Sequence, residues 1–227
     1  MFLTTDNKLK TKLLAWGGAI TLGLVLLGIA WFDKPLYIFM RRFDVPIWRT
    51  FDYIFDVKMW LVLTGILLLI VFAKKSVNSG IKYKNAKNRF SFLSIAKDFM
   101  AKVRTNYAFL IFSSVLSAGI VAKILKILIG RFRPIFFEAL DITGFRPFSF
   151  EWAFNSMPSG HAAATFAGLV MAGMLAPKIK PITWTLAIIV GASRVAYGAH
   201  WPTDVIMGAF IGMVAADVIK WLAFRRK

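Results

Sequence analysis

Long apolar stretches alternate with short polar segments along this chain. Three of the stretches, the first, third and last, hold apolar cores close to the ~20 residues with which a helix crosses a bilayer, and three hold shorter cores. We interpret each stretch as one spanning helix, with a re-entrant segment as the alternative for one of the shorter three. The six helices are expected at about residues 13–32, 58–74, 106–129, 160–176, 181–197 and 203–222.

The fold expected from this pattern is an all-α, integral membrane six-helix bundle with its site between helix ends. Of the 227 residues, 58% are hydrophobic, more than a soluble chain of this length could bury, so residues 1–227 are expected to form a single membrane-embedded domain. The absence of cysteine excludes disulfides and thiolate metal ligands. The first stretch follows three lysines and shows no small-residue cleavage site, so we expect a retained helix rather than a signal peptide.

The net charge of +18 could suit nucleic acid, but the basic residues gather at the ends of the apolar stretches. This placement orients membrane proteins, because cytoplasmic loops carry the excess of lysine and arginine. Eighteen of the 29 basic residues fall on one side of the predicted helices and eleven on the other. We therefore expect both termini and the basic loop 75–105 in the cytoplasm and no nucleic-acid partner. Attraction of this loop to anionic lipid heads is a secondary interpretation.

Two connections on the outer side are rich in aromatic residues. Residues 33–57 are expected either to lie in the interface as an amphipathic segment or to form a surface loop with interfacial aromatics. Residues 135–157 carry seven aromatic side chains, which could either line the entrance of a site or only anchor the protein in the interface. The acids of this second connection are expected mainly at the surface, with a pair to a site arginine as the alternative. These acids are Glu138, Asp141 and Glu151.

Three short polar strings interrupt the apolar pattern, and the only two histidines fall within them. Each string lies at the outer end of a predicted helix, so the topology brings all three to one face. Together they supply three cations, two histidines and a carboxylate, which suit the binding of a phosphate and the cleavage of its ester. The strings are Lys126-x6-Arg133-Pro134, Pro158-Ser159-Gly160-His161 and Ser193-Arg194-x5-His200-x3-Asp204.

The spacing of the first string predicts that Lys126 and Arg133 face one pocket. Residues seven apart on a continuous helix point within roughly 20° of each other, and Pro134 would then help to end that helix. Arginine offers a planar fork that matches phosphate oxygens, and lysine adds a mobile point charge. Basic side chains that reach out to lipid headgroups are the alternative, which suits Lys123 and Arg131 well.

The second string predicts the start of a helix. Ser159 is the expected N-cap, and Gly160 permits a close approach of the backbone. The free N–H groups of the first turn would form an anion site, with His161 one residue inside it. An ordinary loop-to-helix junction is the alternative for Pro158 to Gly160 alone.

In the third string, Asp204 follows His200 by four residues, close enough to accept a hydrogen bond from one imidazole nitrogen. That bond would fix the tautomer and leave the other nitrogen free to attack. Two histidines and an aspartate also suit a divalent metal. The cations Lys126, Arg133 and Arg194 would repel a metal ion, however, so we expect neither a metal nor another cofactor.

With every signature position filled, the three strings resemble the signature of the type-2 phosphatidic acid phosphatase family. The resemblance covers residues 126–204 by motif and the six-helix plan by architecture. It implies that His200 attacks phosphorus to form a phosphohistidine, that Asp204 orients it, and that His161 protonates the leaving oxygen. The expected phosphate-binding residues are Lys126, Arg133, Ser159, Gly160, Ser193 and Arg194.

The function expected from this resemblance is metal-independent hydrolysis of a lipid phosphate at the periplasmic face of a bacterial inner membrane. Members of the family act on undecaprenyl pyrophosphate, phosphatidylglycerol phosphate, phosphatidic acid or lipid A phosphates, and the signature is shared by all of these. Transfer of the phosphate to another lipid is one alternative. Non-catalytic transport of an anionic lipid is another, but it does not explain both histidines beside the cations. The sequence leaves the oligomeric state open.

Overall fold

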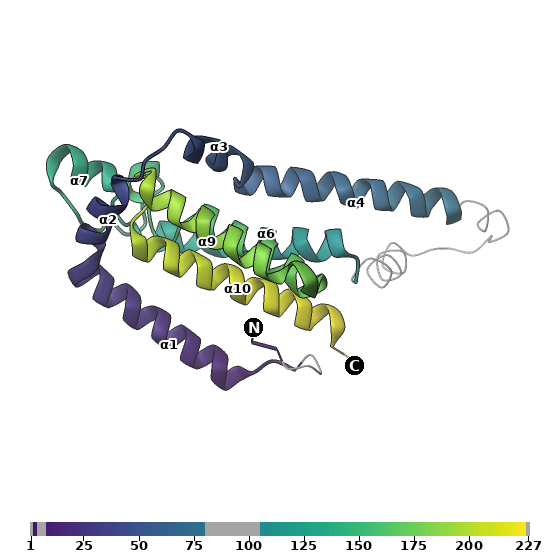
Figure 1. Cartoon of the computed structure of the whole chain (residues 1–227). Helices are drawn as coiled ribbons and strands as arrows, with labels where there is room; N and C mark the ends of the chain where they lie inside the picture. The colour runs from purple at the N-terminus through teal and green to yellow at the C-terminus, as the bar shows by residue number, and fades with distance from the viewer. Residues whose placement is uncertain (1, 4–7, 80–104, 226–227) are drawn as a thin grey trace.

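The computed structural model describes residues 2–3, 8–79 and 105–225. Regular structure in these residues is helical, as the apolar pattern predicts, so the fold is all-α. The long helices are α1 (Thr11–Leu27), α4 (Val57–Ser79), α6 (Tyr107–Ile129), α8 (Gly160–Leu175), α9 (Lys180–Ala196) and α10 (Pro202–Phe224). The shorter ones are α2 (Asp33–Arg41), which continues α1 through a π-helical turn, α3 (Ile47–Ile54) and α7 (Pro134–Leu140). Figure 1 shows these three short helices gathered at one end of the bundle.

Helices lie at all six predicted positions, but their lengths support fewer crossings in the described part of the chain. A fifth crossing results if α3 and the first part of α4, bent by 48° at their junction, count as one. α8 has only 16 residues, fewer than a straight crossing requires. The count of six crossings therefore stays a prediction. The four stretches that are long and apolar enough are Thr11–Arg41, Tyr107–Ile129, Pro177–Ala196 and Pro202–Phe224.

Large apolar side chains cover the outer surface of the bundle. On α1, Trp16 is 69% exposed, and on α4, Leu69 is 71% exposed. Side chains of this kind suit a hydrocarbon surrounding, and together with the long apolar helices they indicate a multi-pass membrane protein.

α8 lies at the centre of the bundle, and small residues permit its close contact with α10. It packs against α4, α6, α9 and α10. At Gly208 of α10, an added Cβ would lie 2.4 Å from the carbonyl oxygen of Ser159, and at Gly212 it would lie 2.4 Å from that of Ala163. Small residues at helix crossings permit this close approach of two backbones. The glycines thereby hold the starts of α8 and α10 side by side.

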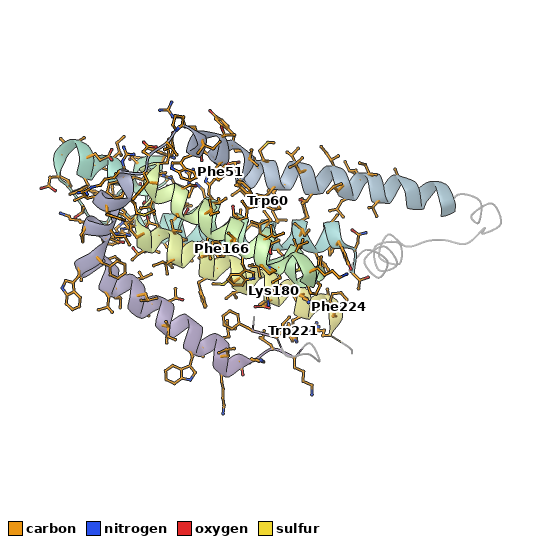
Figure 2. All side chains as sticks on the ribbon, in the orientation of Figure 1. Phe51, Trp60, Phe166, Lys180, Trp221 and Phe224 are labelled. Carbon is orange, nitrogen blue, oxygen red and sulfur yellow. The ribbon has the colours of Figure 1, made fainter. Side chains whose placement is uncertain are left out.

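Aromatic side chains join α3 and α4 to the centre. The ring of Trp60 lies where an added Cβ on Gly168 would approach it to 2.8 Å. Phe51 and Trp60 pack against the buried cluster that contains Phe166, and Figure 2 shows these three labelled side chains leading from α3 into the bundle. This packing fixes α3 beside α9, which it contacts. Residues 33–57 therefore form short helices rather than the surface loop that was the alternative.

Both described ends of the chain lie at the end of the bundle opposite α3 and α7 (Figure 1). The N–H of Phe2 donates to a carboxylate oxygen of Asp217, in the second half of α10, at 2.9 Å. The arrangement agrees with a topology in which both termini share a side, and the assignment of that side to the cytoplasm stays a prediction. Of the predicted inner loop 75–105, α4 takes up the first part and residues 80–104 lie outside the described residues.

Candidate active site

The first string departs from the predicted continuous helix. α6 ends at Ile129, and Gly130 follows with a left-handed backbone, φ +62°. No side chain fits there, because an added Cβ would lie 1.7 Å from the carbonyl oxygen of Arg146. Pro134 begins α7 instead of ending α6. The expectation that one helix carries both cations and ends at Pro134 is therefore wrong.

Lys126 and Arg133 nevertheless reach the same part of the backbone. The ammonium of Lys126 donates to the carbonyl oxygens of Asn155 at 2.7 Å and Ser156 at 3.2 Å. Arg133 donates to three carbonyl oxygens, those of Trp152 (3.0 Å), Ala199 (2.9 Å) and Asn155 (3.4 Å). Because all of these carbonyl acceptors are neutral, they hold Lys126 and Arg133 in place and leave the charge of both side chains available to an anion.

The second string begins α8 as predicted. The hydroxyl of Ser159 accepts a hydrogen bond from the N–H of Ala162 at 3.4 Å and so caps the helix. The N–H of Ser159 donates to the backbone carbonyl of Asp204 at 2.8 Å. An added Cβ on Gly160 would lie 3.7 Å from the side chain of Lys126. The start of α8 therefore lies beside both the first and the third string.

His200 is buried between α9 and α10, with its Nδ1 facing Asp204. The distance from Nδ1 to Asp204 Oδ2 is 3.6 Å, too long for the direct hydrogen bond that the spacing suggests. The Ser156 hydroxyl donates to that carboxylate oxygen at 2.5 Å and lies 3.5 Å from Nδ1. Burial lowers the pKa of His200 well below its usual value, and nearby cations, first Arg133, act in the same direction. The imidazole is therefore neutral, and its Nε2 lies on the side away from the carboxylate.

Arg131 is a buried ion-pair partner and not the lipid-facing side chain that its position suggests. It is 6% exposed, and its two terminal nitrogens reach Asp204 at 2.7 Å and Asp33 at 2.6 Å. Thr203 joins the same network, since it accepts from Arg131 at 2.7 Å and donates to Asp33 at 2.5 Å. Arg131 does not face lipid, because the two buried carboxylates require a cation as their partner.

α3 and the turn after it bring two more carboxylates to the site. Asp52 forms an ion pair with Arg194, and the same oxygen, Oδ1, lies 3.0 Å from Nε2 of His161. Asp56 Oδ2 lies 3.2 Å from that imidazole nitrogen. The Nε atom of Arg194 is buried and has no hydrogen-bond partner among the described residues. Arg194 and His161 therefore meet at one carboxylate oxygen.

The remaining predicted polar groups have partners outside this cluster. The Ser193 hydroxyl donates to the carbonyl of Val190 in its own helix at 2.8 Å, so its contact with a phosphate stays a prediction. The three acids of the outer connection pair at the surface with arginines or lysines outside the three strings. The pairs are Glu138 with Arg41, Asp141 with Lys34, and Glu151 with Arg146.

Aromatic residues of the outer connection lie partly over the site. The Trp152 ring is centred 4.1 Å from the guanidinium carbon of Arg133, yet 64% of Trp152 is exposed. Phe148 and Phe150 are 71% and 78% exposed. The connection thus covers a site cation on one side and presents apolar rings on the other.

The structure brings together eight of the nine site residues expected from the strings, and it adds groups to which the strings did not point. These added residues are Asp33, Asp52, Asp56, Arg131 and Ser156. A neutral imidazole beside several cations can attack an electrophilic centre that carries negative charge, such as phosphorus in a phosphate ester. In the described part of the chain, no group of three or more acidic or histidine side chains is arranged to hold a metal ion. Metal independence stays a prediction.

Comparison with known proteins gives a family match over the motif region and beyond it. The model of the PAP2 superfamily matches residues 107–227. A lipid A 1-phosphatase of Rhizobium johnstonii is 32% identical over 195 residues, which cover 85% of this chain and 74% of the relative. Phosphatidylglycerophosphatase B of Escherichia coli is 34% identical over 76 residues, which cover 31% of this chain and 30% of the relative.

Among solved structures, the chain is similar to the crystal structure of Aquifex aeolicus LpxE, with a TM-score of 0.49 and 18% identity. That alignment covers 82% of this chain and 93% of the other.

Proposed function

The chain belongs to the PAP2 superfamily, and from this premise we propose that it is an integral membrane phosphatase that hydrolyses a lipid phosphate through a phosphohistidine at His200. The observation that carries the proposal is the environment of His200. Its imidazole is neutral and buried, and Nδ1 faces the pair formed by Ser156 and Asp204. The three cations of the strings act on it from nearby. A neutral imidazole that faces a carboxylate with one nitrogen and has positive charge nearby suits attack on a phosphate by its other nitrogen.

In the proposed reaction, Nε2 of His200 attacks phosphorus, and the bond from phosphorus to the lipid oxygen breaks. His161 gives its proton to that oxygen, so the lipid leaves as an alcohol. Water then attacks the phosphohistidine, His161 takes a proton from this water, and inorganic phosphate leaves. Meanwhile Lys126, Arg133 and Arg194 balance the negative charge that spreads over the three equatorial oxygens.

The favoured substrate is a lipid A 1-phosphate. The lipid A 1-phosphatase of Rhizobium johnstonii matches 85% of this chain, so that alignment extends into the helices before the motif region. The match to phosphatidylglycerophosphatase B covers less than a third of the chain. If the helices outside the motif region determine which lipid is bound, the substrate should be that of the relative whose alignment includes these helices, the lipid A 1-phosphatase.

We place the reaction at the periplasmic face of a bacterial inner membrane, with both termini in the cytoplasm. Two observations support this location. The side of the bundle with fewer basic residues is the one that carries the three strings. The described chain ends lie at the opposite end of the bundle.

Phosphate release from a panel of lipids tests the proposal. Purified protein in detergent micelles with EDTA is incubated with lipid A 1-phosphate, undecaprenyl pyrophosphate, phosphatidylglycerol phosphate and phosphatidic acid. We expect release of inorganic phosphate, fastest from lipid A 1-phosphate, and none from the His200→Ala variant. Release from no lipid, or equal release by His200→Ala, would contradict the proposal. Phosphate recovered on a second lipid would instead identify a phosphotransferase.

A further inference from the structure

Two carboxylates from outside the three strings contact the imidazole of His161. Nε2 lies 3.0 Å from Asp52 Oδ1 and 3.2 Å from Asp56 Oδ2. The backbone carbonyl oxygen of Asp52 lies 3.2 Å from the same nitrogen. All three partners are acceptors, so Nε2 carries a hydrogen and the ring is held from the side of α3 and α4.

The contact with Asp52 shares its oxygen atom with the ion pair of Arg194. Its Oδ1 is shared between His161 and Arg194, the residue proposed to bind phosphate. A phosphate oxygen bound at the same terminal nitrogen of Arg194, Nη1, would take the position that this carboxylate oxygen occupies. The buried Nε of Arg194, which has no partner among the described residues, is a further donor available to that phosphate. With a phosphate at that nitrogen, Asp52 could not hold His161 in the same way.

The contact with Asp56 does not involve a phosphate-binding residue. Its other oxygen, Oδ1, accepts from the N–H of Lys58 at 2.7 Å, and its carbonyl accepts from the N–H of Trp60 at 3.0 Å. Asp56 thereby caps α4, and Trp60 anchors this first turn in the core beside Gly168. The carboxylate is therefore fixed by the helix start on one side and faces His161 on the other.

We propose that Asp56 is a positioning residue, which holds the imidazole of His161 when phosphate displaces Asp52 from Arg194. The inference rests on the proposed function, in which His161 protonates the leaving oxygen. With Nε2 held by Asp56, the proton given to that oxygen comes from Nδ1, which must lie within hydrogen-bond reach of it, so a freely rotating ring would lower the rate of bond cleavage. Asp56, at the corner between α3 and α4, thus contributes a carboxylate to the site although it lies 105 residues before His161 in the chain.

The variant Asp56→Ser separates positioning from helix capping. Serine caps helices about as well as aspartate does, but its hydroxyl cannot reach Lys58 and His161 together. Asp56→Glu restores a carboxylate and should recover part of the rate. Asp44→Ser serves as the matched control, because Asp44 lies in the same segment 33–57 and pairs with Arg41 near the surface.

The kinetic test compares an alkyl lipid phosphate with an aryl phosphate, whose leaving group needs little protonation. On the lipid phosphate, Asp56→Ser should lower kcat by at least about tenfold, and by no more than the roughly 10²–10⁴-fold that the general acid itself contributes. KM should stay unchanged, and the loss on the aryl phosphate should be smaller. In a His161→Ala background, the same substitution should cost nothing more. Equal losses on both substrates, or a further loss without His161, would overturn the proposal.

A spectroscopic test does not depend on activity, and it uses the fact that the chain has only two histidines. In protein labelled with ¹⁵N-histidine, Asp56→Ser should shift the ring resonances of His161 more than those of His200, while Asp44→Ser shifts neither. Unchanged His161 resonances in Asp56→Ser would show that Asp56 does not hold the ring. If the native protein released phosphate from no substrate, the proposed function would fail, and this measurement would still decide whether Asp56 holds His161.

Discussion

Replacing Arg131 with methionine removes the cation between two buried carboxylates and should destabilise the protein strongly. Arg131 pairs with Asp204, which is 0% exposed, and with Asp33, which is 3% exposed. Removal of one partner of a buried ion pair costs about 3–5 kcal/mol, because the charge left behind is uncompensated. This corresponds to a change of roughly 10²- to 10⁴-fold in the unfolding equilibrium.

The matched control is Arg146→Met, which removes an arginine from an exposed pair. Its partner Glu151 lies 3.2 Å away, and both side chains are about 60% exposed. Pairs of this kind contribute at most about 1 kcal/mol. Arg131→Lys should fall between the two variants, because one ammonium keeps the charge but cannot span Asp33 and Asp204 as the guanidinium fork does.

The assay is unfolding by denaturant in mixed micelles, followed by the fluorescence of the eight tryptophans. The free energy of unfolding of each variant is compared with that of the native protein under the same conditions. We expect the large loss for Arg131→Met and a small one for Arg146→Met. Equal losses for the two variants would refute the assignment of Arg131 to a buried network.

Three further predictions concern the chemistry and the orientation. Arg133→Lys and Arg194→Lys should each lose much of kcat, because an ammonium cannot bridge two phosphate oxygens, whereas Lys123→Ala should lose little. Equal effects of all three substitutions would exclude specific binding of phosphate by the two arginines. EDTA should leave the rate of phosphate release unchanged, and inhibition reversed by zinc or magnesium would show a metal enzyme. In intact cells, a membrane-impermeant thiol reagent should label Phe150→Cys and spare Lys178→Cys, and the reverse pattern would invert the topology.

The convergence of the three strings could be predicted from the sequence because helix ends carry it. Charge counting assigned Lys126, His161 and His200 to one face, and the structure brings the ends of α6, α8, α9 and α10 together there. The break at Gly130 was missed because a spacing of seven fits a continuous helix. A signal for the break is nevertheless present in the sequence, because a glycine after an apolar stretch is a common end of a helix.

The acids that reach the site from α2, α3 and the turn before α4 could not be assigned from spacing. Asp33, Asp52 and Asp56 precede the strings by at least 70 residues, and their segment was interpreted as interfacial. A weaker signal did exist. Buried cations need compensating charge, and Asp204 is the only carboxylate in the strings. The segment 33–57 holds four aspartates, so charge balance points to this segment. Which of the four aspartates reach the site depends on tertiary packing.

The most direct test of the account is to trap the covalent intermediate. Native protein is mixed for milliseconds with a lipid phosphate labelled with ³²P, quenched in alkali and digested, and the labelled peptide is identified. We expect acid-labile, alkali-stable label on His200 and on no other residue, and its absence from His200→Ala. Label on another residue, or label that persists in His200→Ala, would contradict nucleophilic attack by His200.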